Sequence, residues 1–561
     1  MNDIKLKILE VTKRRGFYWK SYEIYGGLGG FYDYGPLGAS LKDNILQLWK
    51  DYFVTKEGFL LLDSPNIGPE LLYIASGHAE KFTDYMVKCK KCGHVFRADE
   101  LLKGHVDNPE KLDAEGLWKN IKEKGIKCPD CGGELTYPEK FHLMFSTRVG
   151  MDKNAFLRPE TAQGIFINFP IFYRLNREKL PLGVAQIGKG FRNEISPRQG
   201  LLRLREFNMA EIEVFIDPQE KFLLGDVRNI SLPLLTREGK EYRITVEQAV
   251  KMGILSEPMA YFMGKIIIFL EKIGIDIKKV RFRQHSREEL AHYSRDTWDC
   301  EVLLSYGWVE IIGIADRGDY DLKRHMEYSG KDLRAFRRFK SPKKRKIKRL
   351  RARMEILGPL FKNDARKIAE ILENMEYEGG NIEILLEDRK IKIPKNAYEV
   401  VEIEESVGGE RFIPQVIEPS FGIDRILYAI LEHSYYERKD SGYKVLKLKP
   451  RVAPIKAGIF PLVSKEPLTT KALEILKIIR DSGVSCYYDD SGSIGRRYAR
   501  ADEIGVPFCV TVDYTTEKDN TVTIRERDST LQKRVRISEL PEILELLSDE
   551  KINFESLDEN V

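Results

Sequence analysis

Apolar and polar positions alternate on both sides of one turn-rich stretch of this 561-residue chain. The stretch Gly188–Phe215 reads GKGFRNEISPRQGLLRLREFNMAEIEVF, and Pro197 and Gly200 fall between its two halves. Alternation flanking a proline- and glycine-bearing turn predicts an antiparallel hairpin.

Charged and aromatic side chains gather on this predicted hairpin. Because successive side chains of a strand point to opposite faces, Arg192 and Glu194 should share one face of the first strand. Phe207, Glu211 and Glu213 should share one face of the second strand. A guanidinium binds phosphate, a ring stacks on a base, and a carboxylate accepts from an exocyclic amine. An amphipathic hairpin with a charged solvent face gives similar alternation, but the contiguous FRNE and REF strings favour a nucleotide triphosphate site.

A helical pattern follows the string VIEPSFGIDR. Apolar residues recur at helical spacing after it: Ile423, Ile426, Leu427, Ile430 and Leu431. Arg425 then lies in the first turn of an apolar helix, where a buried charge without a partner is costly. An anionic ligand would remove that cost. The alternative is a strand–helix junction with a surface pair of Arg425 and Asp424.

These two blocks resemble motifs 2 and 3 of the class II aminoacyl-tRNA synthetases in their glycyl-tRNA synthetase form, of the dimeric archaeal/eukaryotic-like type. One departure is Asp424, since the family often has glycine there. The resemblance covers nearly the whole chain. It implies an α+β fold, with an antiparallel-sheet catalytic core carrying inserts and a C-terminal α/β mixed-sheet anticodon-binding domain.

The chain divides near residue 450, where Pro450, Pro454 and Pro461 interrupt the pattern. We expect a catalytic domain over 1–450 and an anticodon-binding domain over 451–561, where short apolar strands alternate with helical stretches. SIGRRYARADEIGVPF is the most specific part of the latter resemblance. Three inserts are expected in the catalytic domain, over 87–140, 217–300 and 322–405.

Other segments of the catalytic domain carry weaker signals. The amphipathic pattern of residues 41–53, followed by GFLLLDSPNIGPE, resembles motif 1, which forms the dimer interface of the class; Pro69 is our choice for its proline, with Pro65 as runner-up. The glycines of GGLGGFYDYGPLG match no phosphate-binding fingerprint, so they read as turns that bring backbone close to neighbours. FHLMFSTRVG and AFLRPETAQGIFINF suggest strands and loops of the catalytic sheet, and SYGWVEIIGIADRGDYDL a central strand.

Composition supports a globular protein of a reducing compartment. Hydrophobic content is 42%, and no apolar run approaches the ~20 residues that span a membrane. The first residues lack the apolar core of a signal peptide, so we expect a cytoplasmic protein.

Four of the seven cysteines form two CxxC pairs. Such pairs, each followed by a glycine, predict a closed four-thiolate shell that holds a structural Zn²⁺ rather than disulfides. The predicted ligands are Cys89, Cys92, Cys128 and Cys131. Redox use is the weaker alternative, because both pairs lie in Lys/Gly turns rather than at a helix start.

The strongest basic run is Lys331–Arg353, KDLRAFRRFKSPKKRKIKRLRAR. Such runs are usually solvated faces. Phe336 and Phe339 interleave with the arginines, however, which also suits nucleic acid. The sequence leaves both readings open.

The resemblance implies three sets of site residues. For ATP with Mg²⁺ these are Arg192, Asn193, Glu194, Leu202, Arg203, Leu204, Arg205, Glu206, Phe207, Glu310, Ile311, Gly422, Ile423, Asp424 and Arg425, of which Arg192, Glu194 and Arg425 are expected to be catalytic. For glycine they are Arg97, Glu160, Phe207, Asn208, Met209, Ala210, Glu211, Arg317, Glu418, Pro419, Ser420, Phe421 and Gly422. For tRNA they are Arg496, Arg497, Arg525, Arg527 and Arg534, about half of which should instead be surface salt bridges.

The function that follows is ligation of glycine to tRNA(Gly) by a homodimer. The glycine carboxylate attacks the α-phosphorus, and the terminal ribose of tRNA then attacks the adenylate, so no protein nucleophile is needed. One alternative is a class II synthetase for threonine or proline, against which Glu160, Glu211 and the EPSFG string argue. Another is a synthetase-derived binding subunit without catalysis, which would have lost Arg192, Phe207 or Arg425.

Overall fold

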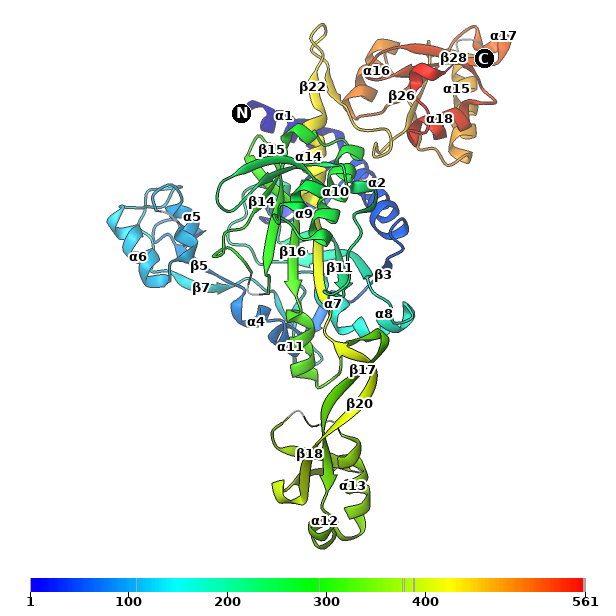
Figure 1. Cartoon of the computed structure of the whole chain (residues 1–561). Coiled ribbons are helices and arrows are strands. Elements are labelled where there is room, and N and C mark those ends of the chain that lie inside the picture. The colour runs from blue at the N-terminus through cyan, green and yellow to red at the C-terminus, as the bar shows by residue number, and fades with distance from the viewer. Residues whose placement is uncertain are drawn as a thin grey trace. The chain divides into compact units, whose positions relative to one another are not determined.

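The computed structural model describes residues 2–106, 108–291, 293–375, 377, 379–386 and 389–557. The chain divides into two compact units (Figure 1). One consists of Met1–Leu333 with Pro414–Val561, and the other of Arg334–Ile413. Among the helices that the structure describes, none combines the length and apolar character needed to cross a bilayer.

A nine-stranded, mainly antiparallel sheet forms the centre of the first unit (Figure 1). Only the β12–β14 and β10–β3 pairs are parallel. The predicted central strand is confirmed as β16, fifth in the order. From one edge to the other the strands are β13 (Glu241–Thr245), β12 (Ser231–Leu235), β14 (Val280–Gln284), β15 (Asp296–Leu304), β16 (Gly307–Gly318), β21 (Gln415–Gly422), β11 (Glu206–Ile216), β10 (Leu182–Phe191) and β3 (Leu60–Leu62).

Three amphipathic helices bury their apolar stripes against one face of this sheet. They are α2 (Pro36–Trp49), α10 (Glu257–Lys272) and α14 (Ile423–Ser434). Phe421 of β21 is fully buried there, with its ring centroid 4.8 Å from that of Phe53 and 5.7 Å from that of Trp49. Because side chains alternate along a strand, the neighbouring residues Ser420 and Gly422 face the opposite side, which is free to carry polar groups.

The predicted hairpin is confirmed as β10 and β11, which pair antiparallel from Leu182↔Phe215 to Phe191↔Glu206. The placement of Arg192 and Glu194 on a strand is wrong. The N–H of Arg192 still donates across the hairpin to Arg205 O at 2.9 Å, but the ladder does not continue, because the N–H of Asn193 donates to Leu143 O at 2.6 Å. Arg192 and Glu194 therefore belong to the β10–β11 loop, which we define as residues 192–205.

The stretch 217–300 is not a separate insert. Its strands β12 to β15 extend the central sheet, and α9 (Val246–Lys251) and α10 pack beside them. Strand pairing across this distance leaves no local signature, which is why the sequence shows only a mixed pattern here.

The cysteine-bearing insert spans slightly more than 87–140. It has a three-stranded sheet and two helices around a small apolar core that includes Val87, Leu102 and Leu117. The strands are β5 (Thr83–Lys88), β6 (Val95–Arg97) and β7 (Glu139–His142), and the helices are α5 (Ala98–Leu102) and α6 (Ala114–Glu123).

FHLMFSTRVG and AFLRPETAQGIFINF do not join the central sheet. Strands β8 (Ser146–Val149) and β9 (Lys153–Leu157) pair with β4 (Ile67–Pro69) in a separate sheet of three strands. The following stretch is helical, as α7 (Ala162–Ile167) and α8 (Phe169–Leu175), where a loop was expected. The remaining helices around this sheet are α3 (Glu70–Ala75), α4 (His78–Lys81) and α11 (Tyr320–Ser329).

The chain begins with α1 (Asn2–Arg15), which leads into a short pair of strands. These are β1 (Tyr18–Lys20) and β2 (Tyr32–Tyr34), and we call Tyr18–Tyr34 the N-terminal hairpin. It contains the glycines of GGLGG. Another short hairpin, β22 (Tyr435–Glu437) with β23 (Lys444–Leu446), precedes the C-terminal domain.

The C-terminal domain has the predicted mixed sheet. Its order is β25-β24-β26-β27-β28, with β24 parallel to β25 and β26, and the last two strands antiparallel. Helices pack on it around a core that includes Ile475, Val510 and Leu544. The elements are β24 (Ala457–Pro461), α15 (Leu468–Asp481), β25 (Cys486–Tyr488), α16 (Ile494–Glu503), β26 (Phe508–Val512), α17 (Thr516–Asp519), β27 (Thr521–Glu526), β28 (Gln532–Arg536) and α18 (Leu540–Ser548).

The second unit, Arg334–Ile413, differs in its bounds from the expected insert of 322–405. The expected start at residue 322 is wrong, because α11 packs on α3 and α7 of the first unit. The unit has a long ribbon of β17 (Ala335–Ala352) with β20 (Tyr398–Phe412), helices α12 (Met354–Phe361) and α13 (Ala365–Asn374), and a hairpin of β18 (Ile382–Leu386) with β19 (Arg389–Ile393).

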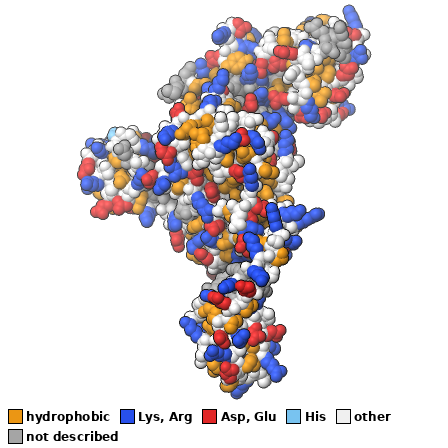
Figure 2. All heavy atoms as spheres, viewed as in Figure 1, with side chains coloured by type: hydrophobic (Ala, Val, Ile, Leu, Met, Phe, Trp, Pro, Cys, Tyr) orange, Lys and Arg blue, Asp and Glu red, His pale blue; other side chains and the backbone are white. Residues whose placement is uncertain are grey.

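The basic run is β17, and an acidic strand lies beside it. Lys346 pairs in register with Glu404 and Lys348 with Glu402, and Arg337 forms an ion pair with Glu410 at 2.5 Å. Figure 2 shows blue and red side chains interspersed over this unit. Cross-strand pairing of opposite charges thus offsets much of the positive charge that the sequence run displays.

Candidate active site

One pocket opens where β10 and β21 end and β11 begins, beside the β10–β11 loop. It brings together most of the residues that the sequence predicts for ATP, and we call it the arginine pocket. Its lining is Arg192, Glu194, Leu201, Leu202, Arg203, Leu204, Phe207, Asn208, Met209, Glu310, Ile311, Ser420, Gly422, Asp424 and Arg425. Four predicted ATP residues do not line it, namely Asn193, Arg205, Glu206 and Ile423.

Arg192 lies between two aromatic rings at the edge of this pocket. Its guanidinium carbon is 5.3 Å from the ring centroid of Phe207 and 5.4 Å from that of Phe82. Its Nε–H donates to Pro159 O at 3.3 Å, and within the described part of the chain it forms no ion pair. The rings fix the plane of the guanidinium without neutralising it, so its charge is available to an anion.

Arg425 forms the opposite wall, in the first turn of α14 as predicted. Its Nε–H donates to Leu202 O at 3.0 Å, and its Nη1 donates to the carbonyl and the Oε2 of Glu310, both at 2.9 Å. The expectation of a buried charge without a protein partner is wrong, since the side chain is 36% exposed and paired with Glu310. These contacts orient the guanidinium across the pocket from Arg192.

A second group of side chains lies deeper on the same face of the sheet, and we call it the carboxylate cluster. Arg317, which is 1% exposed, stands at its centre. Its guanidinium donates to both oxygens of Asp321 at 2.8 and 3.0 Å, to Glu418 at 2.9 Å and to Glu160 at 3.5 Å. Gln163 donates to Glu160 at 2.8 Å and to Asp321 at 3.1 Å. Arg317 therefore holds these carboxylates together, and its predicted pairing with a substrate carboxylate stays a prediction.

Glu211 connects the carboxylate cluster to the arginine pocket. Its Oε2 accepts from the N–H and the hydroxyl of Thr161 at 2.6 and 2.5 Å. Its Oε1 accepts from the hydroxyl of Ser420 at 2.7 Å, and Ser420 also lines the arginine pocket. A small ligand bound at Ser420 would thus touch both a guanidinium pocket and a set of carboxylates.

The carboxyl groups of this cluster differ in pKa, because burial and mutual repulsion raise some of the pKa values while neighbouring cations lower others. Burial, together with the nearby charges of Glu211 and Glu160, raises the pKa of Glu418 to about 8, although Arg317 opposes the shift. Burial also raises the pKa of Glu213 well above its ordinary value, and neither of its oxygens has a hydrogen-bond partner in the described structure. Burial opposes ionisation of Glu160 as well, but Arg317 and His78 hold its pKa well below the ordinary range. Crowded carboxylates of this kind favour a cationic ligand.

The remaining predicted glycine residues divide by strand face. Ala210 and Phe421 turn their side chains into the apolar core, and strand alternation puts Pro419 on the same face as Phe421. Their assignment to the glycine site therefore stays a prediction that only their backbone could satisfy. Arg97 lies on β6 and forms ion pairs with Asp84 at 3.0 Å and Asp99 at 2.7 Å. Its guanidinium has no contact with the carboxylate cluster among the described residues. The predicted contact of Arg97 with a substrate carboxylate stays a prediction.

Sequence reasoning missed several members of the cluster. Asp321 follows Arg317 by four residues across the β16–α11 junction, a spacing that could have suggested the pair. Thr161 and Gln163 stand beside Glu160 in RPETAQG, where the string itself was the available signal. His78 comes from a distant helix, 3.5 Å from Glu160, and no local pattern indicates it.

The four predicted zinc ligands converge. The sulfur atoms of Cys89, Cys92, Cys128 and Cys131 all lie within 4.8 Å of one another. A tetrahedral Zn²⁺ with Zn–S bonds of ~2.3 Å requires S···S distances of ~3.8 Å. Backbone N–H groups of Lys91 and Cys92 point to the Sγ of Cys89 at 3.4 Å, as in a knuckle. Four thiols this close cannot all ionise without a cation between them, so the residues fit a structural zinc with no open position.

The zinc insert contacts the β10–β11 loop. Asp130, between the ligands Cys128 and Cys131, accepts from both Nη groups of Arg198 at 2.8 and 2.7 Å. Arg203 donates to Glu100 at 2.5 Å and to Glu194 at 2.7 Å. The insert thus supports the loop that carries Arg192.

Three of the five arginines predicted to contact tRNA are interior residues, so that prediction is wrong for them. Arg497 is 1% exposed and donates to Ser464, Asp490 O and Gly492 O, each at 2.7 Å. Arg525 forms a bidentate pair with Asp502 at 2.9 and 3.1 Å. Arg527, 2% exposed, is saturated by Asp528, Gly505 O and Leu448 O. Only Arg496, which is exposed, and Arg534, which is partly exposed and bonded to Thr521 and Asp513, remain accessible.

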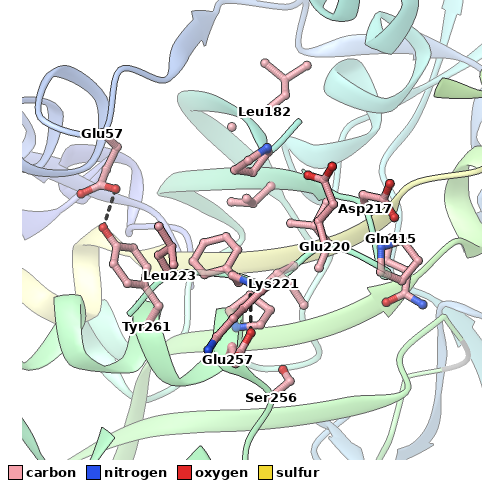
Figure 3. Close-up of a pocket in the computed structure, with 18 of the residues that line it drawn as sticks. Glu57, Leu182, Asp217, Glu220, Lys221, Leu223, Ser256, Glu257, Tyr261 and Gln415 are labelled. Atoms are coloured by element: carbon pink, nitrogen blue, oxygen red, sulfur yellow. Dashed lines mark hydrogen bonds between the residues drawn. The ribbon is translucent and has the colours of Figure 1, made fainter. Parts of the chain in front are cut away.

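A separate cavity of about 710 Å³ lies at the opposite ends of β10, β11 and β21. Leu182, Ile216 and Gln415, the terminal residues of these strands, are among its lining residues. It is larger than the arginine pocket, but its charged lining is five carboxylates and one lysine, which disfavours a triphosphate. Figure 3 shows Tyr261 donating to Glu57 across its wall, a bond of 2.7 Å. None of the predicted site residues lines this cavity.

The fold and site define a class II aminoacyl-tRNA synthetase. Residues 145–327 match the tRNA synthetase class II core domain (G, H, P, S and T), and residues 452–547 match the anticodon binding domain. Among solved structures, the prolyl-tRNA synthetase of Giardia lamblia in complex with prolyl-adenylate aligns with a TM-score of 0.52 at 14% identity, over 98% of this chain and 79% of that chain. At that identity the likeness shows the fold alone.

The closer likeness is to glycine–tRNA ligases. The chain is 48% identical to the glycine–tRNA ligase of Archaeoglobus fulgidus over 97% of both chains. It is 45% identical to that of Methanocaldococcus jannaschii, over 97% of this chain and 98% of the relative. It is 48% identical to that of Pyrococcus horikoshii, over 96% and 97%. The chain belongs to the glycine–tRNA ligase family.

Proposed function

We propose that this enzyme activates glycine with ATP and transfers the glycyl group to the 3′ end of tRNA(Gly). The observation that carries the proposal is the position of Ser420, which lines the arginine pocket and donates to Glu211 of the carboxylate cluster. An amino acid at Ser420 would place its ammonium toward carboxylates and its carboxylate toward the pocket that contains Arg192. That is the arrangement in which a carboxylate attacks an α-phosphorus.

Each wall of the arginine pocket has a role in this reaction. Arg192, which has no carboxylate partner in the described structure, takes the α-phosphate and stabilises the charge that develops there. Phe207, beside it, offers a ring face to the adenine. Arg425 takes the γ-phosphate, and the exposed carboxylate of Glu310 offers oxygen ligands to the Mg²⁺ that accompanies ATP. The magnesium supplies positive charge for the leaving pyrophosphate.

The carboxylate cluster would select glycine by binding its ammonium group and by leaving no space for a larger side chain. Glu211 and Glu160, fixed by Thr161 and Gln163, are the proposed ammonium readers. Because both are held by several bonds, they cannot withdraw to admit a side chain. This argues against the threonine and proline alternatives, and the intact Arg192, Phe207 and Arg425 argue against a non-catalytic subunit.

Two finer features belong to the same proposal. The four-cysteine site would hold a structural Zn²⁺, and reduced thiols with a translational substrate fit a cytoplasmic location. Homodimerisation is supported by exposed apolar side chains on the edge strand β3 and on α8. Leu61 is 53% exposed, Ile171 48% and Leu175 68%, the last two one helical turn apart.

ATP–pyrophosphate exchange with the purified chain tests the function. Exchange should depend on glycine and should be weak with alanine, threonine or proline. Arg192→Ala should lower it by at least ~100-fold, because the lost contact strengthens in the transition state. Exchange that is equally strong with proline, or that is absent while ATP still binds, would disprove glycine activation.

A further inference from the structure

The glycine-rich N-terminal hairpin contacts both walls of the arginine pocket, a role that its sequence does not indicate. On one side it meets the β10–β11 loop. The N–H of Arg205 donates to Gly30 O at 2.9 Å, and the Nη1 of Arg205 donates to Gly29 O at 2.9 Å. Backbone carbonyls of the hairpin therefore fix where Arg205 lies.

Gly30 permits this close approach. Its φ is +79°, a conformation that glycine adopts without strain. A Cβ at this position would stand 2.8 Å from Cγ of Pro197, 3.0 Å from Cγ of Arg205 and 3.2 Å from the backbone nitrogen of Arg205. Any side chain at residue 30 would push the β10–β11 loop away from the hairpin.

The position of Arg205 determines that of the catalytic loop residues. Its Nε and Nη2 donate to Glu194 O at 3.1 and 2.8 Å, and its own carbonyl accepts from the N–H of Arg192 at 2.9 Å. Gly30 is thus two hydrogen bonds away from the backbone that aims the Arg192 guanidinium into the pocket.

On the other side the hairpin meets the start of α14. The hydroxyl of Tyr34 donates to Asp424, which also accepts from the N–H of Asn208 at 2.6 Å and from its side chain at 2.8 Å. Asp424 is 2% exposed and precedes Arg425. Burial raises the pKa of Tyr34 well above its ordinary value, so its hydroxyl stays a donor. Asp424 therefore ties the helix of Arg425 to the strand of Phe207, and Tyr34 ties the N-terminal hairpin to that junction.

We infer that the N-terminal hairpin is the positioning element of the ATP site, in which Gly30 sets the Arg192 wall and Tyr34 sets the Arg425 wall. The inference rests on the proposed function only in taking the arginine pocket to be the ATP site. Arg192 and Arg425 come from different parts of the chain, and a phosphate chain must touch both at once. Holding them at a fixed separation before ATP arrives removes the cost of ordering them on binding.

Hydrogen exchange of the full-length, ligand-free protein tests the first contact. Gly30→Ala should speed exchange at the amides of Arg205 and Arg192. Gly26→Ala is the matched control, because Gly26 lies in the same hairpin at φ +90° and its Cβ would meet nothing within 4 Å. It introduces the same backbone strain without the clash, so the amides of Arg205 and Arg192 should keep their protection. Equal exchange at those amides in both variants would overturn the inference.

ATP binding tests the second contact. Tyr34→Phe removes one of three donors to a buried carboxylate and should weaken binding of a non-hydrolysable ATP analogue roughly tenfold, measured by calorimetry. In pyrophosphate exchange the KM for ATP should rise similarly while the KM for glycine stays unchanged. If Tyr34 only stabilised the fold, Tyr34→Phe would lower Tm without raising the KM for ATP selectively over the KM for glycine. Unchanged analogue affinity in both Tyr34→Phe and Gly30→Ala would overturn the inference.

The proposed function and this inference fail in different ways. If the wild-type protein binds the ATP analogue but shows no glycine-dependent pyrophosphate exchange, the proposed glycine activation is wrong. The affinities for the ATP analogue and the amide hydrogen-exchange rates of the variants still test the role of the hairpin. If glycine-dependent pyrophosphate exchange is normal in Gly30→Ala and Tyr34→Phe at all ATP concentrations, the proposed function stands and the hairpin has no positioning role.

Discussion

Arg527 and Arg496 are the same residue type in the same domain, yet the structure predicts opposite consequences for their removal. The guanidinium of Arg527 donates to Gly505 O at 3.0 Å, to Leu448 O at 2.9 Å and twice to Asp528 at 2.8 Å. Leu448 precedes the C-terminal domain in the chain, so Arg527 also ties that domain to the preceding segment. Arg496 is exposed at the start of α16.

Arg527→Ala should destabilise the C-terminal domain substantially. Two buried carbonyls lose their donors, at about 1–1.5 kcal/mol each, and the pair with the partly exposed Asp528 adds about 1 kcal/mol. The sum, roughly 3–4 kcal/mol, is a large share of the 5–15 kcal/mol that a domain of this size has. Amides of β26 and β27 should then exchange ~100- to 1,000-fold faster, since each 1.4 kcal/mol is a factor of ten.

Hydrogen exchange and tRNA binding on both variants decide the matter. Arg496→Ala should change stability by less than ~0.5 kcal/mol and should lower the salt dependence of tRNA binding by about one phosphate contact. If Arg527→Ala instead keeps its protection and only raises the KM for tRNA, Arg527 is a surface RNA contact and the reasoning from its burial is refuted.

Three further outcomes are expected. Metal analysis should find about one zinc per chain, and Cys128→Ser should lower it and speed exchange across β5 and β6; a metal-free, equally protected protein would refute a structural zinc. Glu211→Gln should lower kcat/KM for glycine by a factor that corresponds to about 2–4 kcal/mol, because the glycine ammonium loses a charged partner. Normal activation of glycine by this variant would show that Glu211 does not bind the ammonium. Glu418 has its pKa raised from 4.5 to about 8, so the free enzyme should lose stability as pH rises between those values, and glycine binding at pH 7 should release up to one proton. Calorimetry in buffers of different ionisation enthalpy detects that proton, and Glu418→Gln should abolish its release.

Features that depend on local periodicity and spacing can be predicted from the sequence alone. The hairpin β10–β11, the amphipathic helix that begins at Ile423, the two cysteine knuckles and the α/β alternation after residue 450 all follow from residues close together in the chain. Their patterns arise from backbone geometry, which repeats every 2 or 3.6 residues and so leaves its mark in any short window.

Which polar side chains are buried, and which groups they contact, becomes visible only in the folded chain. An arginine reads alike in a sequence whether it is exposed, as Arg496 is, or saturated by interior carbonyls, as Arg527 is. Likewise Arg317 receives its carboxylate partners from three separate elements, and Gly30 meets Arg205 across a gap of 175 residues. These contacts depend on how distant segments pack, and burial is set by that packing rather than by any neighbour in the chain. For the same reason the strands of 217–300 reveal their place in the central sheet only once the chain is folded.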